Sequence, residues 1–254
     1  MKPSTAALAL LLCAHLPTTW AQGTCSSDGA PAPRALYERF LPADCADCWG
    51  EPGFAPGPGA AVLDWIAPAA TGDEAALSAA ARTESLTRLQ ALERPVPATT
   101  DVHVAPMGAR LPGRLRLALG PAVNDYVGAS LSYHGALPRG ARGPWTVWLV
   151  LVEQVPAGAE GTRVPRNLVR NMLQRSWTLG EQLSKNEQFN LPRDTRWSER
   201  PTLQLPAGAQ PERLALIGWM EDAAGQVVAT AQASCAPPAQ ASKTLTAAQH
   251  AARP

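Results

Sequence analysis

The sequence predicts an α+β protein whose C-terminal half is a β-sandwich-like domain, and three observations support that class. The chain has 254 residues, enough for one large domain or two small ones. Its 25 prolines and 20 glycines indicate many turns and short strands. Most of its apolar runs are short, whereas residues 71–93 and 165–177 carry apolar side chains at helical spacing. We therefore expect two domains, over residues 34–109 and 110–236.

The first 21 residues have the pattern of a secretory signal peptide. Lys2 supplies a positive charge, residues 6–14 form a short apolar run, and residues 19–21 (Thr-Trp-Ala) form a cleavage site with small residues at its first and last positions. We expect cleavage after Ala21 and a periplasmic or secreted location, with an uncleaved anchor as the alternative. Because neither this run nor any later one is long enough to cross a bilayer as a helix, we expect no membrane span.

The expected N-terminal domain follows a polar lead-in at residues 22–33. Bulky residues bounded by proline and glycine predict its strands, and a capping-box spacing from Thr71 to Glu74 predicts the start of its helix. The elements expected in order are a strand at 35–41, an irregular Pro/Gly-rich segment at 51–59, a strand at 60–66, a helix at 71–93 and a strand at 101–104.

The expected C-terminal domain consists of short strands separated by turn signals, which is typical of a β-sandwich. Residues 145–152 carry bulky side chains on both faces, which predicts a central strand. Pro165 at a first helical position, followed by Leu168 and Met172, predicts a helix at 165–177. The remaining expected elements are strands at 114–119, 126–134, 202–205, 214–221 and 226–232, a loop at 179–201 and a disordered tail at 237–254.

Four cysteines remain after the predicted leader, and an even number in an exported protein predicts disulfides. Four cysteines allow three pairings. We favour a local Cys45–Cys48 bridge and a structural Cys25–Cys235 bridge, because the second would join the two ends of the ordered chain and close a very long loop. On the chain-entropy model such a loop is worth about 4–5 kcal/mol.

Two cysteines separated by two residues suit a redox dithiol, half of a zinc site or a small structural disulfide. Zinc is disfavoured, because no second such pair exists and the remaining histidines are isolated, so we expect no metal and no cofactor. A redox pair sits at the end of a strand and opens a helix. The strand is present at residues 37–40, but the prolines and glycines from Gly50 onward allow at most one helical turn.

The residues around this pair resemble a known family. Residues 36–40 (Leu-Tyr-Glu-Arg-Phe) followed by residues 45–48 (Cys-Ala-Asp-Cys) resemble the start of the secreted thioredoxin-like proteins of the DUF1223 group. Residues 167–170 (Asn-Leu-Val-Arg) resemble that family's Asn-Val-Val-Arg segment, and 214–221 with 227–231 resemble its closing hairpin. The resemblance implies a thioredoxin-like N-terminal domain with the β-rich half appended.

The resemblance also implies roles for single residues. Pro97 would face the pair, usually through a cis peptide bond, with Pro95 as the second choice. Because it is the N-terminal member of the turn, Cys45 would attack a partner disulfide, and Cys48 would resolve the mixed disulfide. The family usually has proline directly after the second cysteine, where this chain has Trp49.

Three further residues are candidates for lining the site. Glu38 would assist proton transfer below the disulfide or form a charge on the strand face, and Trp49 would line a peptide-binding surface or be buried against the loop. Asp47, with Asp44 on the other side of Cys45, disfavours a thiolate, so a redox-active pair is expected to be reducing or slow rather than strongly oxidising.

Two functions remain open at this point. The first is an exported thiol–disulfide oxidoreductase acting on protein thiols or disulfides of the cell envelope. The second is a non-enzymatic envelope binding or assembly protein with a purely structural disulfide. The 22 basic and 21 acidic residues are balanced, which argues against nucleic acid as a partner. No Gly-x-Ser-x-Gly motif or phosphate-binding glycine loop supports another enzyme class, and no feature predicts an oligomeric state.

Overall fold

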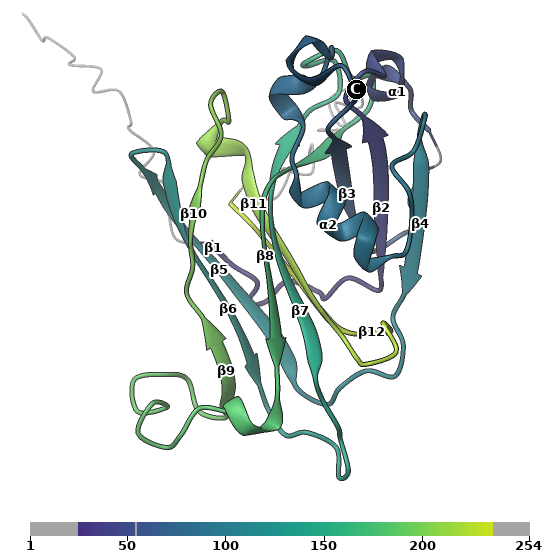
Figure 1. The fold of residues 1–254 in the computed structure, drawn as a ribbon. Helices are drawn as coiled ribbons and strands as arrows, with labels where there is room; N and C mark the ends of the chain where they lie inside the picture. The colour runs from purple at the N-terminus through teal and green to yellow at the C-terminus, as the bar shows by residue number, and fades with distance from the viewer. Residues whose placement is uncertain (1–24, 54, 236–254) are drawn as a thin grey trace, which may run out of the picture.

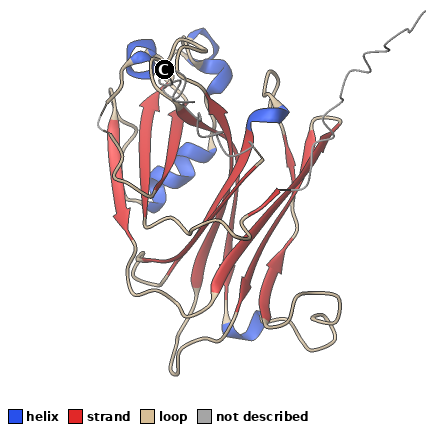
Figure 2. Cartoon of the chain, turned by 180° about the vertical axis from the view of Figure 1, so that it is seen from behind, coloured by secondary structure: helices blue, strands red, loops and turns tan. Residues whose placement is uncertain are grey.

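The computed structural model describes residues 25–53 and 55–235, which fold into two β-sheets with a few short helices (Figures 1 and 2). The expected signal peptide and the expected disordered tail lie outside the described residues. One sheet is antiparallel, and β6 pairs with three of its neighbours. Its strands are β1 (Cys25–Ser26), β5 (Arg114–Val123), β6 (Tyr126–His134), β9 (Thr195–Glu199) and β10 (Thr202–Gln204).

The second sheet is mixed and has seven strands, in the order β12-β11-β7-β8-β3-β2-β4. The β2–β3 and β3–β8 pairs are parallel, and the other pairs are antiparallel. Its strands are β2 (Ala35–Pro42), β3 (Ala60–Ala67), β4 (Asp101–Pro106), β7 (Trp145–Val155), β8 (Arg166–Trp177), β11 (Leu214–Glu221) and β12 (Val227–Ser234). The sheet curls around the helix α2 (Glu84–Ala91), as Figure 1 shows.

The remaining helical elements are single turns. The helix α1 (Ala46–Gly50) follows β2, and four 3₁₀ turns lie in the loops, at Gly72–Glu74, Ser78–Ala80, Leu179–Glu181 and Pro211–Arg213. None of the helices in the described part of the chain has the length and apolar character needed to cross a membrane.

The strand β7 lies between two apolar cores, which explains why its sequence is apolar on both faces. Val147, Leu149 and Leu151 face the antiparallel sheet, whereas Trp148 and Val150 belong to the cluster on the other side, which α2 covers through Leu89. The prediction of a central strand at 145–152 is confirmed.

The two sheets approach closely where β11 crosses β5. A Cβ atom at Gly218 would lie 2.9 Å from Cδ2 of Leu117 and 3.3 Å from the carbonyl oxygen of Trp148. Glycine is therefore the residue that lets this packing occur.

The prediction of an α+β class with a thioredoxin-like domain is wrong. The chain is mainly β, built from a curled mixed sheet and an antiparallel sheet. Strands from both sides of residue 110 share the mixed sheet, so the two expected domains, 34–109 and 110–236, have one sheet in common. The prolines and glycines after Cys48 end α1 after one turn, and α2 has eight residues, so no helical layer of thioredoxin type forms.

Two expected helices differ from the structure. Residues 166–177 form the strand β8, which pairs with β7 along its length, from Val155↔Arg166 to Trp145↔Trp177. This pairing overrides the helical spacing of the apolar residues. The helix expected at 71–93 is reduced to two 3₁₀ turns and α2. Between the second turn and α2, the Arg82 side chain donates hydrogen bonds to the carbonyls of Ala79 and Ala81.

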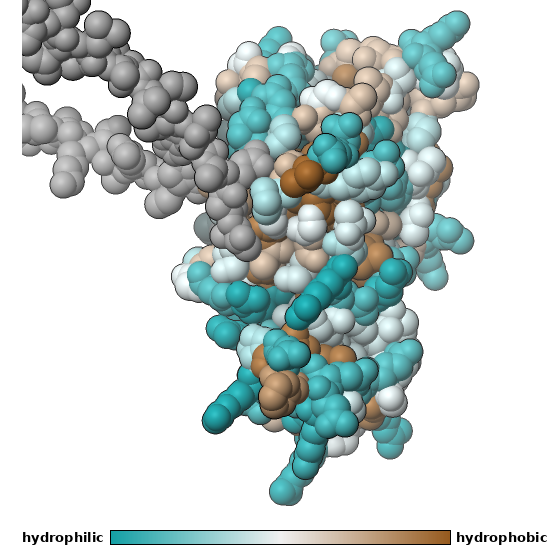
Figure 3. Space-filling model, turned by 90° about the vertical axis from the view of Figure 1, so that its left-hand side faces the viewer, coloured by the Kyte–Doolittle hydropathy of each residue, from teal (hydrophilic) through white to brown (hydrophobic). Residues whose placement is uncertain are grey.

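One face of the molecule is shown in Figure 3, where hydrophilic side chains predominate and apolar areas are small and separate. Such scattered apolar side chains are normal for a protein surface. This face therefore gives no reason to place a partner-binding site on it.

Candidate functional site

The Cys45–Cys48 disulfide lies just beyond the carboxyl end of β2, where the chain turns into α1. Cys45 immediately precedes the helix, and its Sγ accepts a hydrogen bond from the backbone N–H of Cys48 at 3.3 Å. Both cysteines are half-buried, whereas Asp44 and Asp47 are exposed. The disulfide is thus open to solvent on one side and supported by protein on the other.

Cys48 packs on an apolar cluster at this end of the sheet. The buried members of the cluster come from several strands and loops, namely Leu41, Ala43, Trp49, Ile66, Ala75, Val155 and Leu168. Cys45 is not among the side chains that pack against them. This asymmetry favours Cys45 over Cys48 as the sulfur that a partner reaches.

Trp49 is buried directly after the pair, at 4 % exposure. Its Nε1 donates a hydrogen bond to the carbonyl oxygen of Glu160 at 2.7 Å, and the guanidinium of Arg166 lies 5.4 Å from its ring centroid. The side chain therefore anchors α1 to the loop before β8.

A cavity of about 300 Å³ adjoins Trp49. Its walls are mainly small and apolar, from Ile66, Ala76, Leu77, Ala79, Ala80, Leu168, Ala207 and Gly208, and its charged side chains are Glu160 and Arg170. Arg170 is oriented by the fully buried Glu153, whose Oε2 accepts from Nε at 2.7 Å and from Nη2 at 2.6 Å. Apolar walls with one oriented cation suit a short apolar segment of a partner peptide.

Two arginines hold the segment after the disulfide, residues 49–52, through its backbone carbonyls. Nη2 of Arg166 donates to the carbonyl oxygen of Trp49 at 2.7 Å and to that of Glu51. Nη1 of Arg39 donates to the carbonyl oxygen of Pro52 at 3.4 Å. These contacts give the backbone a fixed course although it is rich in proline and glycine.

Both arginines share one fully buried carboxylate, that of Asp64 in β3. Its Oδ1 accepts hydrogen bonds from Nε of Arg39, at 2.7 Å, and from Nη2 of the same arginine. The same oxygen lies 3.7 Å from Nη1 of Arg166. Its Oδ2 accepts a hydrogen bond from the backbone N–H of Asn167 at 2.8 Å. Burial raises the pKa of the Asp64 carboxyl to about 6, although Arg39 and the Asn167 amide act in the opposite direction. Arg39 and the Asn167 amide therefore favour the ionised form of this buried carboxyl.

A second buried network contains Glu38. Its carboxylate accepts two hydrogen bonds from Arg88 of α2, and Nη1 of Arg88 donates to Oε1 of Glu221 at 2.9 Å. The stacked rings of Trp148 and Trp219 also donate through Nε1 to Glu221, each at 2.9 Å. Glu38 is therefore a buried member of an ion-pair network rather than an isolated acid or an exposed strand-face charge.

Pro97 lies in the loop between α2 and β4 and is half-buried. Among the described residues the cis peptide bond is Gly143–Pro144, so the bond before Pro97 is trans. Pro97 is not among the apolar residues that support Cys48. Its role opposite the disulfide stays a prediction.

Sequence reasoning missed most of the buried charges at this end of the fold. One signal was available: Asp64 interrupts the apolar strand Ala-Val-Leu-Asp-Trp-Ile, and a charge inside such a run requires a buried partner. Its partners Arg39 and Arg166 are 25 and 102 residues away, and no local pattern joins them.

In the parts of the chain that the structure describes, no group of three or more His, Cys, Asp or Glu side chains could hold a metal ion. Comparisons with protein-family models, with curated proteins and with solved structures found no match to this chain.

Proposed function

We propose that this chain is a thiol–disulfide exchange protein of the periplasm or extracellular space that acts through Cys45 and Cys48. The observation that carries the proposal is the half-exposed disulfide just beyond the carboxyl end of β2, with Cys45 Sγ accepting the N–H of Cys48. A hydrogen bond to sulfur stabilises the thiolate, which is the reactive form. The resemblance of residues 36–48 to the DUF1223 group belongs to the same proposal.

The short loop that the disulfide closes supports an exchange role. Cys45 and Cys48 are three positions apart, whereas Cys25 and Cys235 are 210 positions apart. On the chain-entropy model the long loop stabilises the fold by about 5 kcal/mol and the short one by about 2 kcal/mol. The Cys45–Cys48 bond contributes little to stability in comparison, so redox chemistry is the better account of it.

The proposed step begins with the reduced pair. The thiolate of Cys45 attacks a disulfide of a partner protein, a Cys45–partner bond forms, and one partner sulfur leaves as a thiolate. The thiolate of Cys48 then attacks Cys45 Sγ, which releases the second partner thiolate and leaves the Cys45–Cys48 disulfide. A dithiol protein of the same compartment returns two electrons to the pair and restores the starting state.

The test is the reduction potential of the purified protein in thiol–disulfide buffers, with alkylation and mass spectrometry to assign each cysteine. We expect Cys45 and Cys48 to titrate reversibly as a pair between about −120 and −270 mV, toward the reducing end because of Asp44 and Asp47. A C48A variant should then trap a mixed disulfide through Cys45. A potential below about −300 mV, typical of structural disulfides, would overturn the proposal.

The second candidate is an envelope binding or assembly protein in which the disulfide is structural. The firm attachment of residues 49–52 to Arg39 and Arg166 favours it, because exchange usually benefits from a pliable site. A pair that resists reduction, together with no trapped partner for C48A, would select this candidate.

A further inference from the structure

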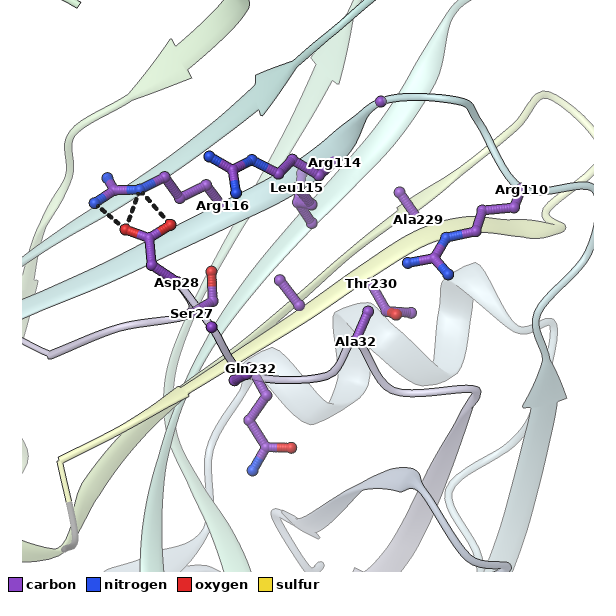
Figure 4. A pocket seen from close by; sticks show the side chains of 14 residues that line it. Ser27, Asp28, Ala32, Arg110, Arg114, Leu115, Arg116, Ala229, Thr230 and Gln232 are labelled. Atoms are coloured by element: carbon purple, nitrogen blue, oxygen red, sulfur yellow. Dashed lines mark hydrogen bonds and ion pairs between the residues drawn. The ribbon is translucent and has the colours of Figure 1, made fainter. Parts of the chain in front are cut away.

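A second concave site lies away from the cysteine pair, between β5, β12 and the segment that leads from β1 to β2 (Figure 4). Its volume is about 210 Å³. Pockets for drug-sized ligands are larger, about 300–1,000 Å³, so the crevice suits a small head group. We define it by Ser27, Asp28, Arg110, Arg114, Arg116 and Gln232, which lie around a floor formed by Leu115, Ala229 and Ala231.

The charges of the crevice do not balance. Three arginines line it, and Asp28 is its acid. Asp28 is already bound by Arg116, whose Nε lies 2.8 Å from Oδ2 and whose Nη2 lies 2.6 Å from the same oxygen. The hydrogen bond from Arg116 is the main reason that the pKa of Asp28 is lowered. Two positive charges therefore remain.

Those two charges are Arg110 and Arg114, which are exposed. Within residues 25–53 and 55–235, neither guanidinium forms an ion pair or a hydrogen bond, although Arg114 is near enough to Asp28 to help lower the pKa of its carboxyl. In Figure 4, Arg110 reaches over the crevice from the loop before β5, and Arg114 extends from β5 itself. The Arg114 side chain is directed along β5 toward Arg116, so the two exposed side chains would turn toward each other to bind one anion with cations from two separate elements.

The backbone around the crevice is firmly held. Arg110 lies in a loop whose neighbours donate to β12, from Gly108 N to the carbonyl oxygen of Val227 at 2.8 Å and from Leu111 N to that of Val228 at 3.1 Å. The side of the crevice formed by residues 27–32 is fixed by Thr230, whose Oγ1 donates a hydrogen bond to the carbonyl oxygen of Pro33 at 2.6 Å. The Cys25–Cys235 disulfide ties this side to the end of β12 covalently.

Ser27 adds an uncharged donor. Its Oγ accepts the backbone N–H of Leu117 at 3.0 Å, and its own hydroxyl proton has no acceptor among the described residues. Figure 4 shows this oxygen directed into the space beside Asp28. Two guanidinium forks and one hydroxyl match the oxygens of a phosphate group, since arginine binds phosphate through paired hydrogen bonds.

We propose that this crevice binds a phosphomonoester or free phosphate dianion, held by Arg110 and Arg114 with Ser27 as a third donor. The site is independent of the thiol chemistry, because it contains neither Cys45 nor Cys48. A doubly charged oxyanion neutralises both unpaired guanidinium groups, whereas a single carboxylate leaves one positive charge over.

The first experiment is isothermal titration of the full purified chain with inorganic phosphate at pH 7.5 and low salt. We expect binding in wild type and at least a tenfold weaker Kd in R110Q/R114Q, since each lost charged hydrogen bond is worth about a factor of ten. The matched control is R139Q/R142Q, which removes the same charge from exposed arginines of the loop before β7 and should keep the wild-type Kd within twofold.

A second arm separates the sources of the phosphate group. The protein is mixed with phosphatidylcholine vesicles that contain phosphatidic acid, and the vesicles are sedimented. If wild type sediments with them and R110Q/R114Q does not, the phosphate group is lipid-borne. Binding of inorganic phosphate without sedimentation assigns a soluble ester. The proposal is overturned if neither probe binds, if acetate binds as tightly as phosphate, or if both double variants lose affinity equally.

Discussion

The guanidinium of Arg88 forms two parallel hydrogen bonds with the carboxylate of Glu38, from Nε to Oε1 at 2.8 Å and from Nη2 to Oε2 at 2.7 Å. Both side chains are almost completely buried, at 1 % and 0 % exposure. The pair joins α2 to the mixed sheet. Burial alone would lower the pKa of Arg88, but Glu38 and Glu221 outweigh that effect and raise it, so the cation is permanent.

Replacing Arg88 by methionine should destabilise the fold by about 3–5 kcal/mol, because two buried carboxylates would lose their cation. Urea denaturation at pH 7.5 measures the loss. The matched control is R94M, which removes an arginine that is one-third exposed and paired with Asp101. The control should cost no more than about 1 kcal/mol. Equal losses in the two variants would show that the Glu38–Arg88–Glu221 network does not stabilise the fold.

Replacing Arg166 by lysine should loosen the segment after the disulfide, because lysine cannot reproduce the planar guanidinium that reaches two backbone carbonyls at once. Hydrogen exchange followed by mass spectrometry should show faster exchange at residues 49–53, with β7 unchanged. R213K, at a partly exposed ion pair with Glu160, is the control and should leave residues 49–53 protected. Unchanged exchange in R166K would contradict the anchoring role of Arg166.

The two disulfides should differ in their effect on stability. C25S/C235S removes the constraint on the long loop and should cost about 5 kcal/mol, whereas C45S/C48S should cost about 2 kcal/mol or less. Guanidinium denaturation of both variants, compared with oxidised wild type, checks the difference. A larger loss in C45S/C48S would assign the local disulfide a structural role and weaken the exchange proposal.

The contribution of His103 to stability should fall as the pH drops below about 6.5. Burial lowers the pKa of His103 below its usual value of 6.5, with Arg88 and Arg94 acting in the same direction and Glu38 and Glu221 opposing them. The unfolded chain therefore takes up this proton at a higher pH than the folded chain. The stability from the neutral ring is complete above pH 6.5 and is lost as the pH falls through the lower folded pKa.

The check is the free energy of unfolding of wild type and H103Q at pH 7.5 and at pH 5. Asp64, whose raised pKa changes stability in the opposite direction over part of this range, is present in both proteins and cancels. H103Q should lose less stability than wild type between the two pH values. An equal loss would mean that His103 titrates alike in the folded and unfolded chains.

Strands with clear turn signals could be predicted from the sequence. The strands expected at 35–41, 60–66 and 214–221 agree with β2, β3 and β11 to within one residue at each end. Their bulky residues are bounded by glycine or proline, so local chemistry decides both identity and limits. The two disulfides also have the favoured pairing, one of the three that four cysteines allow.

The strand β8 and the buried charges could not be predicted in this way. Leu168 and Met172 have helical spacing, but the pairing of β8 with β7 decides the conformation, and that contact is a property of the whole sheet. In the same way, the contacts of Asp64 with Arg39 and Arg166 depend on the parallel pairing of β2 with β3 and of β3 with β8. Only the assembled sheet brings the three side chains together.

The Cys25–Cys235 bond turns the described part of the chain into a covalent ring. A protease that cuts once between the two cysteines, for instance in the exposed loop around Phe189, opens the ring without dividing it. The cut protein should keep its mass on a gel run without reductant and separate into two pieces when reductant is added. The ring thus lets the molecule survive a single backbone break as one particle.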